Sequence, residues 1–176
     1  MLEFSDKGYR YFEPKPNRLV EGMVRWLNRR LYLPGKEHRI DEVEIMNPEV
    51  VADAIDRAGH RLLLLPNHPT HSDPQIMVEV FRQLKLPASF MAAYDVFLRS
   101  GMTAWCMQKM GCFSVDREGS DRASMKEAIR ILKEGQRALT IFPEGNVYLT
   151  NDRVTPFLEG PAFIGLKAQK DIGADS

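Results

Sequence analysis

Residues 59–74 read GHRLLLLPNHPTHSDP, and this stretch decides the fold class. Its apolar run, Arg61–Leu65, is short and is bounded by glycine and proline, which predicts a buried strand. The pair Asp73-Pro74 is typical of a helix start, with the aspartate as the cap and the proline in the first turn. A polar loop that contains histidines therefore joins a strand to the helix that follows it.

The same alternation of short apolar runs and longer amphipathic segments continues on both sides of this stretch. Because such long crossovers cannot be hairpins, successive strands are expected to run parallel. The predicted fold class is α/β: a layered domain with a mostly parallel central sheet and helices on both faces, preceded by an N-terminal amphipathic helix. Strands are predicted at Arg61–Leu65, Ala88–Ala93, Cys112–Val115 and Arg137–Phe142, and helices at Arg18–Tyr32, from Asn47 to Gly59, from Asp73 to Leu84, from Asp95 to Met110, from Ser120 or Asp121 to Glu134, and from Pro161 to Lys170.

Length and charge suit one globular domain that does not bind nucleic acid. The chain has 176 residues, and its 24 Lys+Arg balance 24 Asp+Glu, so no overall positive field attracts a polyanion. We expect residues 1–47 to form an arm and a basic amphipathic helix, and residues 48–176 to form the α/β domain. The sequence shows no signal peptide and no membrane span, which predicts a cytoplasmic protein whose two cysteines are reduced.

The predicted helix Arg18–Tyr32 is a candidate membrane contact. It has an apolar stripe with Trp26 near one edge, and its polar face is basic. Such a helix can lie in the plane of an anionic lipid surface, which predicts a peripheral protein at the inner face of the membrane. The alternative is that the stripe packs on the domain.

Polar residues follow the predicted strands at the carboxyl ends, where open α/β sheets bind ligands. His68 and Asp73 could form a general base with an orienting carboxylate, although Asp73 could also be a simple helix cap. His71 lies between them, but only two further histidines, His38 and His60, remain in the chain. The sequence therefore predicts no metal site, and no Gly-x-Ser-x-Gly motif indicates a serine hydrolase.

Two further strand exits carry candidate binding residues. Arg117 could hold a phosphate or carboxylate through its planar guanidinium, or pair with neighbouring acids on the surface. Glu144-Gly145 follows another strand, and the glycine would allow a ligand to approach the backbone closely. An ordinary polar turn is the alternative for this pair. If the strands are parallel, His68, Arg117 and Glu144 share one rim of the sheet.

In this order, the motifs resemble those of the glycerolipid acyltransferase family, which includes 1-acylglycerol-3-phosphate acyltransferases. The first resembles the family's Asn-His-x4-Asp block, the second a glycine and hydrophobic strand followed by Asp-Arg, and the third its Pro-Glu-Gly block. The resemblance extends over about residues 61–170. The matching stretches are Asn67–Asp73, Gly111–Arg117, Phe142–Gly145 and Thr155–Gly160.

The resemblance implies transfer of a fatty acyl group from acyl-CoA or acyl-carrier-protein to a hydroxyl of a lyso-glycerolipid such as 1-acylglycerol-3-phosphate. His68 would be the base and Asp73 its orienting acid, with no metal and no bound cofactor. Substrate binding would fall to Asn67, Arg117, Glu144 and Gly145.

The sequence departs from the family pattern at two places. Relatives often carry Thr-Arg-Ser where this chain has Asn146-Val147-Tyr148, and the family's fourth block is missing, so the domain is expected to be truncated at its C-terminus. A hydrolase, metal-dependent or not, and a non-catalytic lipid-binding remnant are the alternative functions.

Overall fold

A computed structural model describes residues 8–117, 119, 121–150 and 153–174. A helix start at Ser120 lies outside the described residues, whereas Asp121 is the N-cap of the helix concerned and accepts a hydrogen bond from Ser124 N.

The strands form a four-stranded sheet in the order β1-β4-β2-β3, and every neighbouring pair is parallel. The prediction of a parallel α/β sheet is thus confirmed. The strands are β1 (Leu63–Leu64), β2 (Ala88–Ala93), β3 (Phe113–Val115) and β4 (Ala138–Thr140). Only β2 has the predicted length. The others are shorter because fewer residues are in register with a neighbouring strand.

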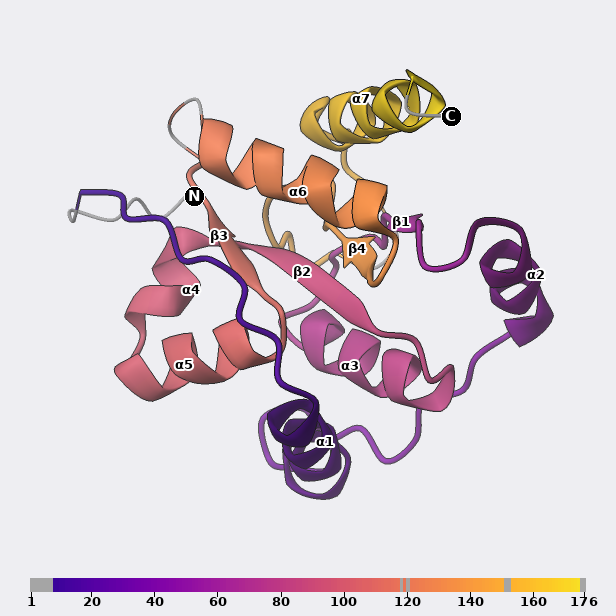
Figure 1. The fold of residues 1–176 in the computed structure, drawn as a ribbon. Helices are drawn as coiled ribbons and strands as arrows, with labels where there is room; N and C mark the ends of the chain where they lie inside the picture. The colour runs from indigo at the N-terminus through magenta and orange to yellow at the C-terminus, as the bar shows by residue number, and fades with distance from the viewer. Residues whose placement is uncertain (1–7, 118, 120, 151–152, 175–176) are drawn as a thin grey trace.

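Helices cover both faces of this sheet. In Figure 1, α6 and α7 lie above it, while α1, α3, α4 and α5 lie below it. Each face has its own core, one built around Phe81, Phe90 and Phe97 and the other around Phe113 and Ile164. Burial on both faces explains why the strands read as continuous apolar runs. The helices are α2 (Pro48–Ala58), α3 (Asp73–Gln83), α4 (Tyr94–Leu98), α5 (Gly101–Lys109), α6 (Arg122–Glu134) and α7 (Gly160–Ala174).

Some helix boundaries differ from prediction. The helix expected from Asp95 to Met110 is two helices, because Ser100 is extended and its side chain caps α5 by accepting from Thr103 N. Asn47 was expected to cap α2, but it adopts a left-handed conformation and makes no side-chain cap bond. Ser72, rather than Asp73, is the N-cap of α3, which leaves the Asp73 carboxylate available for another contact.

The N-terminal helix packs on the domain through charged side chains of its polar side and through Val24. It consists of α1 (Arg18–Leu27) and a π-helical continuation, η1 (Asn28–Tyr32). Buried Glu21 pairs with Arg137 at 2.8 Å, and Arg29 pairs at 2.7 Å with buried Glu79 of α3. A hydrogen bond from Arg82 is the main reason that the pKa of Glu79 lies below its ordinary value. These contacts hold the polar face of the helix against the domain.

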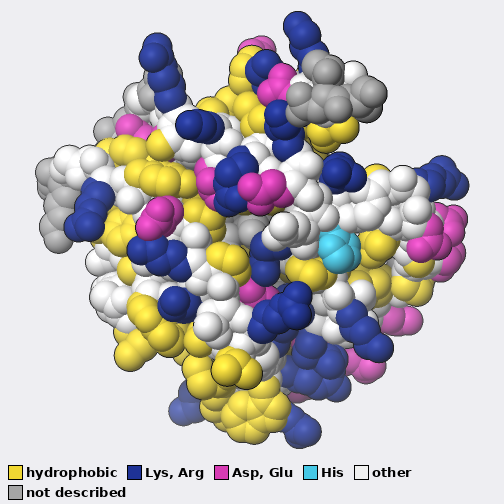
Figure 2. All heavy atoms as spheres, in the orientation of Figure 1, with side chains coloured by type: hydrophobic (Ala, Val, Ile, Leu, Met, Phe, Trp, Pro, Cys, Tyr) yellow, Lys and Arg dark blue, Asp and Glu magenta, His cyan; other side chains and the backbone are white. Residues whose placement is uncertain are grey.

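One side of the apolar stripe of the same helix points to solvent. Leu19 is 85% exposed, Met23 49% and Trp26 59%. Figure 2 shows hydrophobic side chains gathered over α1 at the bottom of the view, with basic side chains beside them. The stripe is therefore divided: Val24 packs against the core of the domain, whereas Leu19, Met23 and Trp26 are left exposed. No helix among the described residues is long and apolar enough to cross a membrane.

Candidate active site

The loop between β1 and α3 carries a histidine–aspartate pair. His68 Nδ1 lies 2.8 Å from Asp73 Oδ2, and both side chains are nearly buried. The imidazole stacks on the ring of Phe142, with 4.1 Å between centroids. A carboxylate at Nδ1 favours the tautomer that is protonated there, which leaves the lone pair on Nε2. Nε2 has no hydrogen-bond partner in the described part of the chain.

Asp73 is itself held by a residue that the sequence reasoning missed. The backbone N–H of Thr70 donates to Asp73 Oδ2 at 2.8 Å, and the Thr70 hydroxyl donates to Oδ1 at 2.7 Å. Both carboxylate oxygens are thus engaged, so the carboxylate cannot rotate freely away from His68. A threonine three residues before an aspartate in a turn is a local signal that could have indicated this contact.

Glu144 joins its own motif stretch to the stretches that contain His68 and Thr155. Its side chain is buried, and Oε1 accepts the backbone N–H of His68 at 2.8 Å. Oε2 accepts the hydroxyl of Thr155 at 2.6 Å. From the sequence, Glu144 is either a substrate-binding residue or part of an ordinary polar turn. In the structure, each carboxylate oxygen of Glu144 accepts a hydrogen bond from the protein, at the base of the His68 loop.

Gly145 has a structural reason to be glycine. Its φ is +70°, and a Cβ atom there would lie 2.6 Å from Leu158 Cδ1. Leu158 also donates its backbone N–H to the carbonyl of Pro143. The space into which a Cβ would project is therefore occupied by Leu158.

Arg117 bridges the exits of two strands. Its Nη1 donates to the carbonyl of Gly145 at 3.0 Å, and its Nη2 donates to Asp95 Oδ2 at 2.7 Å. Pairing with a sequence neighbour was the expected alternative, but the partner is Asp95 of α4, which no local pattern indicates. The structure thus brings His68, Glu144, Gly145 and Arg117 together on one rim. Asn67 is exposed beside His68.

Other reactive groups lie apart from this rim network. His71 is exposed, and burial raises the pKa of Cys112 to about 12, which leaves that thiol protonated near neutral pH. Within the described ranges, no cluster of three or more His, Cys, Asp or Glu side chains could hold a metal ion.

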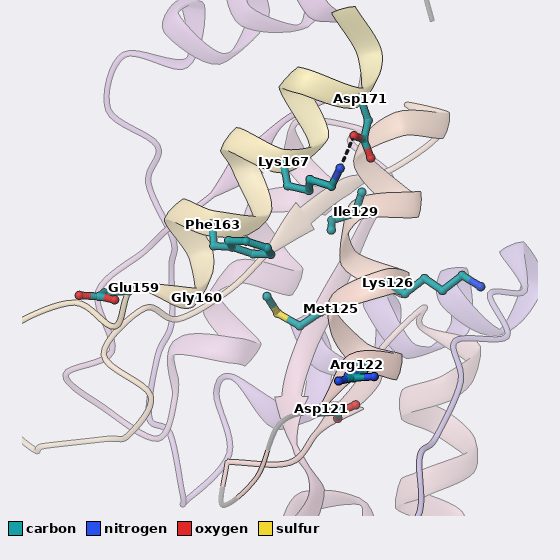
Figure 3. Close-up of a pocket in the computed structure, with 10 residues that line it drawn as sticks. All are labelled: Asp121, Arg122, Met125, Lys126, Ile129, Glu159, Gly160, Phe163, Lys167 and Asp171. Atoms are coloured by element: carbon teal, nitrogen blue, oxygen red, sulfur yellow. Dashed lines mark hydrogen bonds and ion pairs between the residues drawn. The ribbon is translucent and has the colours of Figure 1, made fainter. Parts of the chain in front are cut away.

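A cavity of about 690 Å³ opens between α6 and α7. In Figure 3, Met125, Ile129 and Phe163 project into it from the two helices, and the ion pair of Lys167 with Asp171 closes one end. None of the residues predicted for the active site lines it. The cavity is therefore a feature separate from the histidine–aspartate pair.

Comparisons with known proteins identify a family for most of the chain. A sequence model of the family described as Acyltransferase matches residues 42–172. A 1-acyl-sn-glycerol-3-phosphate acyltransferase from Streptococcus pneumoniae (strain ATCC BAA-255 / R6) is 30% identical over 94 residues, which are 53% of this chain and 34% of that protein. The match thus spans about a third of the length of this curated relative. No solved structure matches the chain.

Proposed function

The chain belongs to the glycerolipid acyltransferase family, and from this premise we propose that it transfers a fatty acyl group from a thioester to the hydroxyl of a lyso-glycerolipid. One observation carries the proposal. His68 is oriented by a carboxylate at Nδ1 and presents Nε2 without a protein partner. This is the geometry that a general base for a hydroxyl needs. The donor is acyl-CoA or acyl-carrier-protein, and the acceptor resembles 1-acylglycerol-3-phosphate.

The proposed reaction is a direct transfer. The acceptor hydroxyl attacks the thioester carbonyl carbon while His68 Nε2 takes the hydroxyl proton, and Asp73 stabilises the imidazolium that forms. The tetrahedral intermediate then expels the thiolate as its C–S bond breaks. His68 returns the proton to the departing sulfur. The products are an ester and a free thiol, and no step requires a metal or a bound cofactor.

A thiol-release assay with a panel of lyso-glycerolipid acceptors, followed by mass analysis of the product, tests this function. Thiol release that requires an acceptor, with the acylated acceptor as product, is the expected result. Release without an acceptor that is blocked by a chelator would instead identify a metal-dependent hydrolase. Ligand binding without turnover would identify a non-catalytic lipid-binding remnant.

Arg117 is proposed to bind the anionic group of the acceptor, because Asn146-Val147-Tyr148 offers no cation where relatives often carry Thr-Arg-Ser. We expect Arg117→Gln to raise the acceptor KM about tenfold, which corresponds to one lost charge-assisted hydrogen bond. The donor KM should change little. Steady-state kinetics with each substrate varied in turn measures both constants.

Asp95→Asn is the matched control for Arg117. It removes the carboxylate that pairs with Arg117 but keeps the guanidinium. The acceptor KM of this variant should stay near or below that of the wild type. An equal rise of both KM values in Arg117→Gln would contradict the role in acceptor binding and indicate a structural bridge only.

The exposed stripe of α1 is proposed to lie on a lipid surface. A soluble domain gains nothing from exposing Leu19, Met23 and Trp26 together, while a bilayer interface buries such a stripe. Arg18 and Arg30 of the same helical segment are also exposed, and each cation near an anionic surface contributes about 1 kcal/mol. The acceptor is a lipid, so this contact would bring the enzyme to its substrate.

Met23→Ser combined with Trp26→Ser is expected to weaken binding to anionic vesicles about tenfold or more. Each apolar side chain buried fully is worth about 1.5–3 kcal/mol, and these two side chains are roughly half exposed in the free protein. Vesicle flotation measures the effect. Val50→Ser, at a position that is 63% exposed on α2, is the control and should bind like the wild type.

Unchanged flotation of the double variant would exclude this helix as the lipid contact. Charge reversal at Arg25 or Arg29 is a poor test. Both residues face the domain, so reversal would place an acid against Glu21 or Glu79 and affect folding rather than binding.

A further inference from the structure

A chain of hydrogen bonds links the N-terminal segment to the histidine–aspartate pair. His38 Nδ1 lies 2.8 Å from Ser72 Oγ, and the backbone N–H of Ser72 donates to Thr70 Oγ1 at 3.2 Å. The Thr70 hydroxyl donates to Asp73 Oδ1, whose other oxygen meets His68 Nδ1. One histidine that lies outside the recognised motifs is thus connected to the proposed base through the residues that hold its carboxylate.

The hydroxyl of Ser72 is directed away from its usual role. Ser72 is the N-cap of α3, where a serine side chain normally accepts a backbone N–H of the first turn, but it makes no such bond. Its hydroxyl pairs with His38 instead. Without His38, the hydroxyl would lose this partner, and Ser72, whose backbone N–H donates to Thr70 Oγ1, would be held less firmly.

The segment that carries His38 is firmly held in place. It follows η1, and Ile40 N donates to the carbonyl of Leu33 at 2.7 Å, which closes the segment into a loop. Leu33 is buried, and His38 is itself partly buried. At the start of η1, Asn28 Nδ2 donates to the carbonyl of Gln75 in α3. The N-terminal segment therefore contacts α3 both within its first turn and at its N-cap.

We propose that His38 is a positioning residue for acyl transfer: it holds Ser72, and through the turn at Thr70 it keeps Asp73 directed at His68. This role rests on the proposed function, because it acts through the general base of that reaction. The segment that follows η1 would then have a second role besides the proposed lipid contact of α1, because its His38 helps to hold the active-site loop.

The kinetic test compares three variants. His38→Ala should lower kcat about tenfold with both KM values nearly unchanged, since misplacement of a catalytic group by a fraction of an ångström has effects of this size. His38→Asn, whose amide can reach Ser72 Oγ from a similar position, should restore most of kcat. His60→Ala is the control, because His60 pairs with the carbonyl of Gln136, which belongs to no motif stretch, and should behave like the wild type.

A double-mutant cycle ties the effect to Ser72. Ser72→Ala should lower kcat by a similar factor, and the double variant with His38→Ala should be little worse than either single variant, because both remove the same contact. Additive losses would overturn the proposal. So would a wild-type kcat in folded His38→Ala, or a loss in His38→Asn equal to that of His38→Ala.

A spectroscopic measurement keeps this test independent of turnover. The proton between His68 Nδ1 and Asp73 should give a low-field NMR resonance, which would be assigned by its absence in His68→Ala. In His38→Ala and Ser72→Ala this resonance should shift or broaden, while His38→Asn and His60→Ala should keep it. An unchanged resonance in His38→Ala overturns the positioning role. A shifted resonance in a chain with no transferase activity would support the positioning role and reject the proposed function.

Discussion

Replacing His68 with alanine should reduce the rate of acyl transfer by about 10²–10⁴, because loss of a positioned general base has effects of this size. A hydroxyl is a poor nucleophile until its proton is removed, and the lone pair of Nε2 is the proposed acceptor of that proton. The variant should stay folded. The backbone N–H of His68 that donates to Glu144 is retained in alanine, and only the imidazole stacked on Phe142 is lost. Thiol release per folded protein, with folding checked by circular dichroism, measures the loss.

Two further variants test whether His68 and Asp73 act together. Asp73→Asn should be almost as damaging, because the amide disturbs the tautomer of His68 and removes the charge that stabilises the imidazolium. His71→Ala is the matched control, since His71 is an exposed histidine of the same loop that takes no part in the pair. If His71 were essential and His68 dispensable, or if chelators abolished activity, a metal-dependent mechanism would replace the one proposed here.

The sequence allowed the sheet and its rim to be predicted because both follow from local patterns. Short apolar runs between breakers located the strands, and the length of the crossovers required parallel pairing. Once the strands are parallel, their carboxyl ends meet, so His68, Arg117 and Glu144 had to lie on one rim. The break at Ser100 falls at Arg99-Ser100-Gly101, which interrupts the apolar pattern and is a local signal that the prediction of a single helix did not use.

The partners of the polar residues could not be predicted in the same way. Glu144 bonds to the backbone of His68 and to the hydroxyl of Thr155, and Arg117 pairs with Asp95. Each contact joins loops that are distant in sequence, and periodicity carries no information about such pairs. The contact of His38 with Ser72 is also made between residues that are distant in sequence, and it places a histidine that precedes the first strand beside the active-site loop.

The orientation of α1 shows a second limit of sequence patterns. The periodicity of the helix defines an apolar and a polar face, but it does not say which face packs inward. Here the domain presents Arg137 and Glu79 to the helix, and these charges pair with Glu21 and Arg29. Complementary charge therefore helps to orient the helix, and the apolar side chains Leu19, Met23 and Trp26 remain exposed while Val24 packs on the core. Only the three-dimensional arrangement of distant charged residues contains this information.

Glu144→Ala is expected to lower kcat/KM about 10²-fold, although Glu144 is proposed to touch neither substrate. The variant leaves the backbone N–H of His68 and the hydroxyl of Thr155 without their partner. The loop that carries His68 would then shift, and a displacement of about 1 Å at a catalytic group can reduce the rate by this factor. The loss should appear in kcat with the donor and acceptor KM values little changed, because substrate contacts remain.

Glu144→Gln separates this positioning role from a role in which the charge contacts substrate. Glutamine keeps a carbonyl oxygen for the N–H of His68, and its amide can donate to the Thr155 hydroxyl, which can act as donor or acceptor. The amide therefore preserves both bonds while removing the charge. If Glu144 holds the His68 loop, the glutamine variant should recover most of the activity that the alanine variant loses. If glutamine is as damaging as alanine in a folded protein, the carboxylate must act on a substrate through its charge, and the positioning role would be wrong.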